Sequence, residues 1–139
     1  MRLEGTCHCQ NIAIVLETEQ DPGELPLRAC ACSFCRRHGA RTTSDPNGRA
    51  RVGIQDRSLV SRYVFGLRTA EMIVCARCGV YCGAMLREGN QAWAVQNVNL
   101  FPHPAFDRPA RTVSYEGESA EQRIARRKKL WTPLELLEP

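Results

Sequence analysis

Eight cysteines are the residues of this chain best suited to chemistry, and seven of them fall into three short clusters. The clusters are a C-x-C at Cys7 and Cys9, a C-x-C-x-x-C at Cys30, Cys32 and Cys35, and a C-x-x-C at Cys75 and Cys78. Thiolates at such spacing surround a metal ion tetrahedrally, and zinc is the usual occupant, although iron also accepts these ligands. The spacing therefore predicts zinc sites.

The first and last clusters each offer two thiolates, which makes them matching halves of one site. The C-x-x-C is followed by Gly79, as in zinc ribbons, where a tight turn presents both sulfurs. If residues 7–9 are a strand, the sulfurs of Cys7 and Cys9 point to one side and His8 to the other. Together the two clusters would close a structural site. Spacing alone leaves a second pairing open, in which the first and middle clusters share the metal and the last is the open or redox site.

The middle cluster offers three thiolates within six residues. Three protein ligands leave the fourth position of a zinc ion to water or to a substrate. A tri-thiolate zinc is a poor Lewis acid, but it holds an incoming thiol as the thiolate, so the chemistry it favours is thiol activation. The alternative is a purely structural site that Cys82 or His38 closes. A Cys82 that binds no metal is interpreted as a small buried apolar residue.

Length, composition and charge indicate a single domain in a reducing compartment. The chain has 139 residues, no apolar run at its start, and no stretch of the roughly 20 apolar residues that span a bilayer. We therefore expect a cytoplasmic protein without membrane contact, in which spaced cysteines are metal ligands rather than disulfides. The net charge of +4 falls to about +1 if seven thiolates hold two zinc ions, which makes nucleic acid an improbable partner.

Short strands are expected to position the cysteines. Runs of β-branched and apolar residues predict strands over 11–17, 50–54, 59–65, 72–74, 83–87 and 91–98. Glu88-Gly89-Asn90 separates the last two strands and predicts a hairpin. Residues 27–32 are expected to be extended, after which Ser33 caps a short helical turn that ends at Gly39.

The end of the chain has a helical pattern instead. Ser119 and Gln122 have the spacing of a capping box, which predicts a helix over 120–131 that Pro133 prevents from continuing. One face of this helix is interpreted as solvated because it is rich in basic residues, namely Arg123, Arg126, Arg127, Lys128 and Lys129.

The cysteine clusters and their neighbours resemble a known family. GTCHC at 5–9, CACSFCRRHG at 30–39 and CARCGVY at 75–81 are similar to the motifs of the glutathione-dependent formaldehyde-activating enzyme family, which includes the centromere protein V type of domain. The three motifs in this order span most of the chain. The resemblance implies a mainly β, Mss4-like (β-tent) zinc-binding fold with a short C-terminal helix. We expect the zinc domain over 1–117 and a helical tail over 118–139 that packs on the same domain.

The resemblance also implies ligands and an activity. It implies two zinc ions per chain, a structural one held by Cys7, Cys9, Cys75 and Cys78, and a catalytic one held by Cys30, Cys32 and Cys35. It implies a carbon–sulfur lyase-type enzyme that activates a glutathione-like thiol for addition to formaldehyde or another small aldehyde. The alternative is a non-catalytic zinc module that binds a protein or nucleic acid.

Five polar residues are candidates for the substrate side of the second site. Arg36 and Arg37 follow the triplet and would attract carboxylates, unless they are merely solvated. His38 is a candidate zinc ligand or proton shuttle, with an exposed turn residue as the alternative. Asn97 and Asn99 resemble an asparagine-bearing segment of the family and would share one face of a strand.

Overall fold

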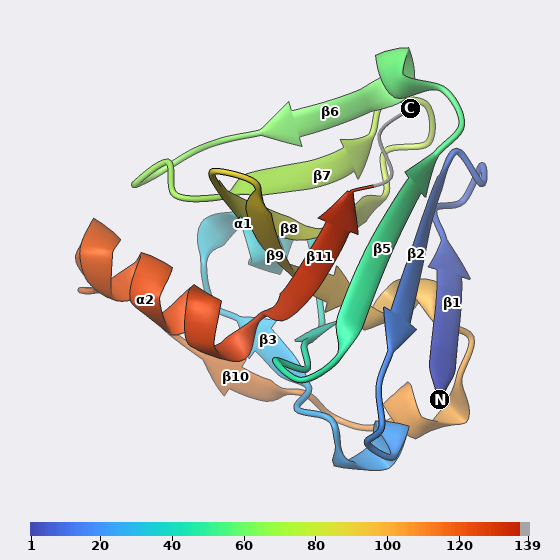
Figure 1. The fold of residues 1–139 in the computed structure, drawn as a ribbon, viewed down its shortest axis with the longest axis horizontal. Coiled ribbons are helices and arrows are strands. Elements are labelled where there is room, and N and C mark those ends of the chain that lie inside the picture. Colours follow the sequence, from blue (N-terminus) through green and yellow to red (C-terminus); the bar gives the residue numbers. More distant parts are fainter. Residues whose placement is uncertain (137–139) are drawn as a thin grey trace.

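The structure, a computed structural model, describes residues 1–136 and is mainly β (Figure 1). Its strands are β1 (Arg2–Thr6), β2 (Ile12–Glu17), β3 (Arg28–Cys30), β4 (Thr42–Thr43), β5 (Arg49–Ile54), β6 (Val60–Tyr63), β7 (Glu71–Cys75), β8 (Tyr81–Glu88), β9 (Gln91–Asn97), β10 (Arg111–Val113) and β11 (Thr132–Leu136). Its α-helices are α1 (Ser33–His38) and α2 (Ala120–Leu130). A mainly β fold with a short C-terminal helix was expected, and the structure confirms it.

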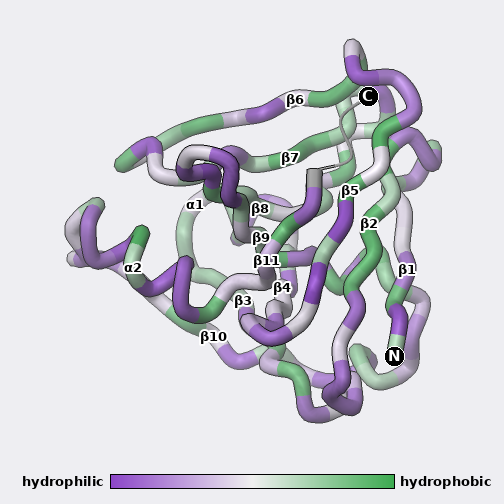
Figure 2. The backbone as a smooth tube through the Cα atoms, viewed as in Figure 1, coloured by the Kyte–Doolittle hydropathy of each residue, from purple (hydrophilic) through white to green (hydrophobic). Residues whose placement is uncertain are grey.

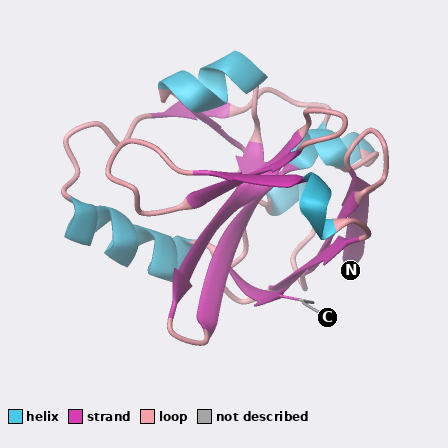
Figure 3. Cartoon of the chain, turned by 90° about the horizontal axis from the view of Figure 1, so that it is seen from above, coloured by secondary structure: helices cyan, strands magenta, loops and turns pink. Residues whose placement is uncertain are grey.

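The strands form one mixed sheet with a branch. Its main path runs β1-β2-β5-β11-β9-β4-β3-β10, while β8, β7 and β6 continue from β9. Two of the pairings are parallel, β11 with β5 and β10 with β3, and the others that the structure describes are antiparallel. Figure 3 shows the strands crossing the centre of the molecule with the helices at its periphery.

The apolar pattern explains why the strands pack as they do. Ile12, Ile14 and Leu16 of β2 are buried, and they alternate with partly buried residues, as a strand between two neighbours requires. They belong to a core that includes Val98 and Phe106. Figure 2 shows hydrophobic residues recurring along β2 and β7, whereas α2 is largely hydrophilic.

Two local predictions agree closely with the structure. Glu88 pairs with Gln91, so the predicted hairpin turns through Gly89 and Asn90, and Gly89 has the positive φ of 61° that such a turn needs. In the predicted capping box, the hydroxyl of Ser119 accepts the backbone N–H of Gln122 at 3.1 Å, and the Gln122 side-chain oxygen accepts the Ser119 N–H at 2.9 Å.

The segment after α2 was not foreseen. The helix ends at Leu130, and the chain continues as β11, in which Pro133 pairs with Trp93 of β9. On its other side β11 pairs in parallel with β5, so that Leu134 lies opposite Ala50. Residues 137–139 of the predicted tail lie outside the described part. Within that part, neither helix is long and apolar enough to cross a bilayer.

Candidate metal centres

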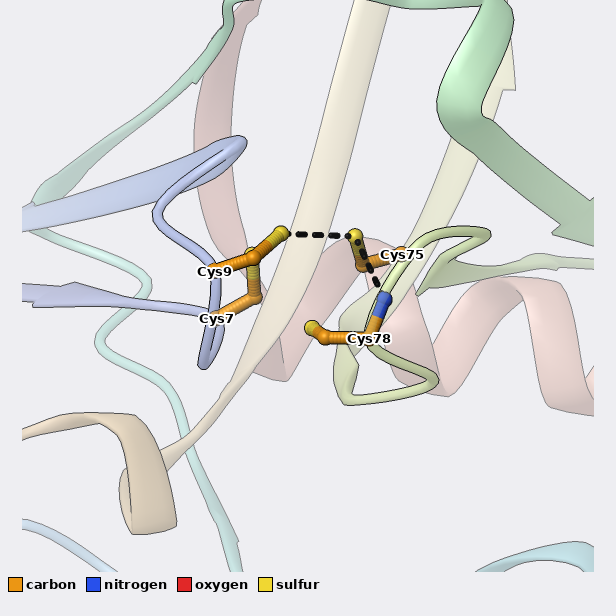
Figure 4. A group of neighbouring side chains, drawn as sticks. All are labelled: Cys7, Cys9, Cys75 and Cys78. Atoms are coloured by element: carbon orange, nitrogen blue, oxygen red, sulfur yellow. Dashed lines mark hydrogen bonds between the residues drawn. The ribbon is translucent and has the colours of Figure 1, made fainter.

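The first cysteine group joins two turns that are remote in sequence (Figure 4). Cys7 and Cys9 lie between β1 and β2, while Cys75 ends β7 and Cys78 lies in the turn that leads to β8. The sulfur atoms of these four residues all lie within 4.8 Å of one another. The structure therefore groups the first and last clusters, as the preferred pairing predicts.

The spacing of the sulfurs fits a tetrahedral zinc ion. Cys7 Sγ and Cys9 Sγ are 3.8 Å apart, and Cys9 Sγ and Cys75 Sγ are 3.5 Å apart. Four sulfurs at about 2.3 Å from zinc would be separated by about 3.8 Å, whereas a disulfide needs about 2.05 Å. All eight cysteines, each within the described residues, are free. The four thiols thus have the arrangement of a closed structural metal site.

Backbone amides of this group favour thiolates. The N–H of Ile12 donates to Cys7 Sγ at 3.3 Å, and the N–H of Cys78 donates to Cys75 Sγ at 3.5 Å. Burial acts to raise the pKa of Cys78, yet backbone N–H groups lower it to about 6. For Cys7, burial prevails and raises the pKa to about 11. Four thiolates this close repel one another, so a cation is needed to hold them all ionised.

The local structure of the C-x-C differs from the prediction. The condition that residues 7–9 are a strand is not met, because these residues lie in a turn after β1 in which Gln10 has a φ of +71°. Strand β1, which precedes this turn, needs a glycine at position 5, because a Cβ there would lie 2.2 Å from the carbonyl oxygen of Leu100. The two sulfurs still converge, because the turn folds Cys9 back over Cys7, and His8 is exposed.

The triplet forms a second group where a strand meets a helix. Cys30 ends β3, Cys32 precedes α1, and Cys35 lies within it, with all three sulfurs within 4.8 Å of one another. Cys32, not Ser33 as predicted, is the N-cap of α1, and its sulfur accepts the backbone N–H of Cys35 at 3.4 Å. The helix ends as predicted at Gly39, which has a φ of 57°.

Among the described residues, no fourth cysteine, histidine or carboxylate joins the triplet. His38 instead packs its ring against Phe34 and Tyr81, with centroid distances of 4.5 and 5.5 Å. Cys82 is 1% exposed and lies in the core beside the first group, where burial raises its pKa. It donates to the carbonyl oxygen of Val80 at 3.6 Å. The triplet therefore has the ligand set of a zinc site with an open position.

Within the triplet, the thiols of Cys30 and Cys35 differ in how readily they lose a proton. A hydrogen bond from Cys35 lowers the pKa of Cys30 to about 5, and the same contact with Cys30 raises the pKa of Cys35. Three thiols this close cannot all ionise without a cation between them. A zinc ion would supply that charge, so the residues present fit the group that the sequence predicts.

A cavity of about 370 Å³ opens beside the triplet. This volume is in the usual range of small-molecule sites, about 300–1,000 Å³. Apolar side chains line part of it, namely Phe65, Met72, Tyr81, Val95 and Trp131. Another part is lined by the guanidinium groups of Arg28, Arg123, Arg126 and Arg127. The triplet thus faces a pocket that is apolar on part of its surface and strongly basic on another.

The predicted substrate-side residues on α1 lie outside the lining of this pocket. Arg36, Arg37 and His38 are exposed, and Arg37 donates back to the carbonyl oxygen of Ser33 at 3.0 Å. A role of these three residues toward a substrate stays a prediction.

The two asparagines support the backbone around the site. Asn97 is buried and donates to the carbonyl oxygen of Tyr81 at 2.8 Å, and its side-chain oxygen accepts the N–H of Asn99 at 3.2 Å. Asn99 donates to the carbonyl oxygen of Gly39 at 3.2 Å and accepts from Arg41 at 3.0 Å. Neither lines the pocket, and their substrate role also stays a prediction.

The basic residues of α2 were interpreted wrongly. Arg127 is only 9% exposed, and Arg123 and Arg126 both bind the carboxylate of Glu118, at 3.3 and 2.9 Å. The helix face that we expected to be solvated thus lines part of the pocket. Their common orientation could have been predicted, because the spacing i, i+3 and i+4 places these arginines on one face of a helix.

Comparison with known proteins identifies a related crystal structure. No protein-family model and no curated protein matches the sequence significantly. A crystal structure of a Rhodobacter sphaeroides protein is similar, with 31% sequence identity and a TM-score of 0.58 over 80% of this chain and the whole of that one. At that identity and coverage, the two chains belong to one family.

Proposed function

We propose that this protein is a zinc-dependent enzyme of the carbon–sulfur lyase type, which adds a thiol to formaldehyde or another small aldehyde. The observation that supports it most is the triplet Cys30, Cys32 and Cys35, whose open side meets a cavity of about 370 Å³. The resemblance of its motifs to the formaldehyde-activating family points to the same chemistry. A closed structural site would have no use for such a cavity.

The two metal sites have different tasks in this proposal. A zinc ion held by Cys30, Cys32 and Cys35 would bind the substrate thiol as a thiolate. The closed group of Cys7, Cys9, Cys75 and Cys78 would hold together the two turns on which it lies. Phe65 and Trp131 make part of the cavity apolar.

Tyr81 is placed to assist the addition. Its side chain lines the cavity and is 2% exposed, and its hydroxyl has only a weak acceptor, Met72 Sδ at 3.9 Å. Burial raises the pKa of Tyr81 well above its usual value, so the hydroxyl keeps its proton. We assign it as the hydrogen-bond donor to the aldehyde oxygen. As the carbon–sulfur bond forms, the carbonyl π pair moves to that oxygen, which takes from solvent the proton that the thiol has lost.

The test is the exchange between free glutathione and its formaldehyde adduct, followed by NMR with protein of known zinc content. The wild-type protein is expected to accelerate the exchange. Cys32→Ser should lose the acceleration while it retains the first metal site. Two bound zinc ions without any acceleration would contradict the proposal for this pair of reactants.

The binding-module alternative has less support. It rests on the basic helix and on the resemblance to the centromere protein V type of domain. Arg123 and Arg126 of that helix are engaged with Glu118, and Arg127 is buried. Few of these charges are thus free for a phosphate backbone.

A further inference from the structure

Two arginines that line the cavity have no carboxylate partner among the described residues. Arg28 donates to the hydroxyl of Ser44 at 3.0 Å, and Arg127 donates to the hydroxyl of Thr69 at 2.6 Å. The Nε of Arg127 has no hydrogen-bond partner in that part of the chain. These two residues differ from Arg123 and Arg126, which share the carboxylate of Glu118.

Burial of a guanidinium group without a carboxylate partner is unfavourable. Arg127 is 91% buried, since 9% of its surface is exposed, and burial together with the charges of Arg126 and Arg123 lowers its pKa to about 10. Arg28 is half-buried. Buried charges without partners destabilise a fold, and unpaired buried polar groups are typical of ligand sites.

The metal site does not neutralise all of this charge. Four arginines line the cavity. Three negative charges face them, those of Glu116, of Glu118 and of a tri-thiolate zinc, which has a net charge of about −1. One positive charge remains, which a substrate thiolate on the zinc would balance. The case for a carboxylate therefore rests on the missing acidic partners of Arg28 and Arg127 and on the unpartnered Nε of Arg127, not on the net charge.

We propose that Arg28 and Arg127 form a carboxylate-binding subsite of this cavity, so that one of the two reactants is a small carboxylic acid. The inference rests on the proposed function and names the kind of substrate that the site selects. The planar guanidinium group donates two parallel hydrogen bonds to a carboxylate, which an ammonium group does not.

Both guanidinium groups are held in position before a ligand binds. Thr69, in the loop between β6 and β7, binds one end of Arg127, and the ring of Trp131 lies 4.8 Å from its guanidinium carbon. Ser44, just after β4, binds Arg28 and donates in turn to the carbonyl oxygen of Leu130 at 2.7 Å. Side chains fixed in this way lose little entropy on binding.

The subsite lies near the reacting centre. Arg28 and Arg127 line the same cavity as Cys30, Cys32 and Cys35. The acid must also be small, because the whole cavity has about 370 Å³. Two sources supply this chemistry. The acid is either the thiol, as in 3-mercaptopropionate, or the aldehyde, as in glyoxylate.

The test compares matched acidic and neutral reactants on the zinc-loaded full chain. In the first arm, calorimetry measures the binding of 3-mercaptopropionate and of 3-mercaptopropan-1-ol. In the second arm, the rate of addition of the neutral thiol is measured with glyoxylate and with acetaldehyde. We expect a preference of about tenfold or more for the acid in one of the arms, and that arm identifies the source.

Four variants test the residues. Arg127→Gln and Arg28→Gln should abolish the preference without loss of zinc, whereas Arg36→Gln, which removes an exposed arginine outside the cavity, should keep it. Arg127→Lys retains the charge but lacks the planar group, and it replaces Arg127→Gln if that variant does not fold; we expect it to lose most of the preference.

The results separate this inference from the proposed function. Equal affinities and rates for acid and neutral compounds in both arms would overturn the inference, as would a full preference in Arg28→Gln or in a folded Arg127 variant. Turnover without acid preference would leave the enzyme proposal intact. If the acid is preferred in binding but no turnover is seen, the result supports the carboxylate subsite and contradicts the proposed activity.

Discussion

The sulfur atoms of Cys9 and Cys75 lie 3.5 Å apart, although 66 residues separate the two cysteines. The contact brings the turn after β1 against the end of β7, and these two strands lie in different parts of the sheet. A metal ion at this point joins segments that are not neighbouring strands. Its loss should therefore affect the whole fold and not one turn.

Cys75→Ser tests this role. We expect it to reduce the zinc content from two ions per chain to one, or to none if the chain unfolds. The free energy of unfolding should fall by about 3 kcal/mol or more, because structural zinc contributes directly to folding. Native mass spectrometry and thermal unfolding measure both quantities.

Cys82→Ala is the matched control for that variant. Cys82 is buried like Cys75 but belongs to neither cysteine group. We expect two zinc ions and a loss of about 1 kcal/mol from the smaller side chain. A Cys82→Ala protein with one zinc ion would show that this cysteine is a ligand and would contradict the two-group arrangement.

The two sites should also release their metal at different rates. The triplet faces a cavity and has an open position, whereas four thiolates enclose the first site. A chromogenic chelator is therefore expected to remove one zinc ion in a fast phase and one in a slow phase. In Cys32→Ser only the slow phase should remain. A single phase in the wild-type protein would contradict the difference between the sites.

Tyr81→Phe removes one hydroxyl from the cavity and leaves the ring. If this hydroxyl donates to the aldehyde oxygen, kcat for the addition should fall by roughly 10- to 100-fold, with KM for the thiol little changed. The zinc content should stay at two. Tyr63→Phe is the control, because Tyr63 is 50% exposed and does not line the cavity. Equal kcat values for Tyr81→Phe and wild type would exclude this role.

Gly5→Ala should disturb the first metal site through the backbone. A Cβ at Gly5 would lie 2.2 Å from the carbonyl oxygen of Leu100, so the strand must shift, and we expect a loss of about 2–4 kcal/mol in unfolding free energy. Gly53, on β5, has no atom within 4 Å of the same position and serves as the control. Denaturant unfolding of both variants measures the difference, and equal stabilities would contradict the steric argument.

The features that the sequence predicted well depend on short-range chemistry. The capping box of Ser119 and Gln122 and the turn at Gly89 each involve residues no more than three positions apart. The preferred grouping of the cysteines agrees with the structure, although spacing alone left a second pairing of the clusters open.

The features that were missed depend on partners far along the chain. Strand β11 pairs with β5, whose residues precede it by more than 80 positions, as in the pair of Leu134 and Ala50. No local pattern identifies such a partner. The burial of Arg127 was missed for a related reason, because the hydropathy of a helix does not show that Thr69, 58 residues earlier, accepts a hydrogen bond from its guanidinium group.

Strand β11 has a consequence for how the protein is made. In the sheet as described, β11 is the only strand that connects β1, β2 and β5 with the remaining strands. Synthesis starts at the N-terminus, so no strand pairing joins these two parts of the described sheet until residues 132–136 have left the ribosome. The cysteines of the first site are all available much earlier, after Cys78. Zinc binding would thus precede closure of the sheet, and the metal would hold the two parts of the sheet together while β11 is still being translated.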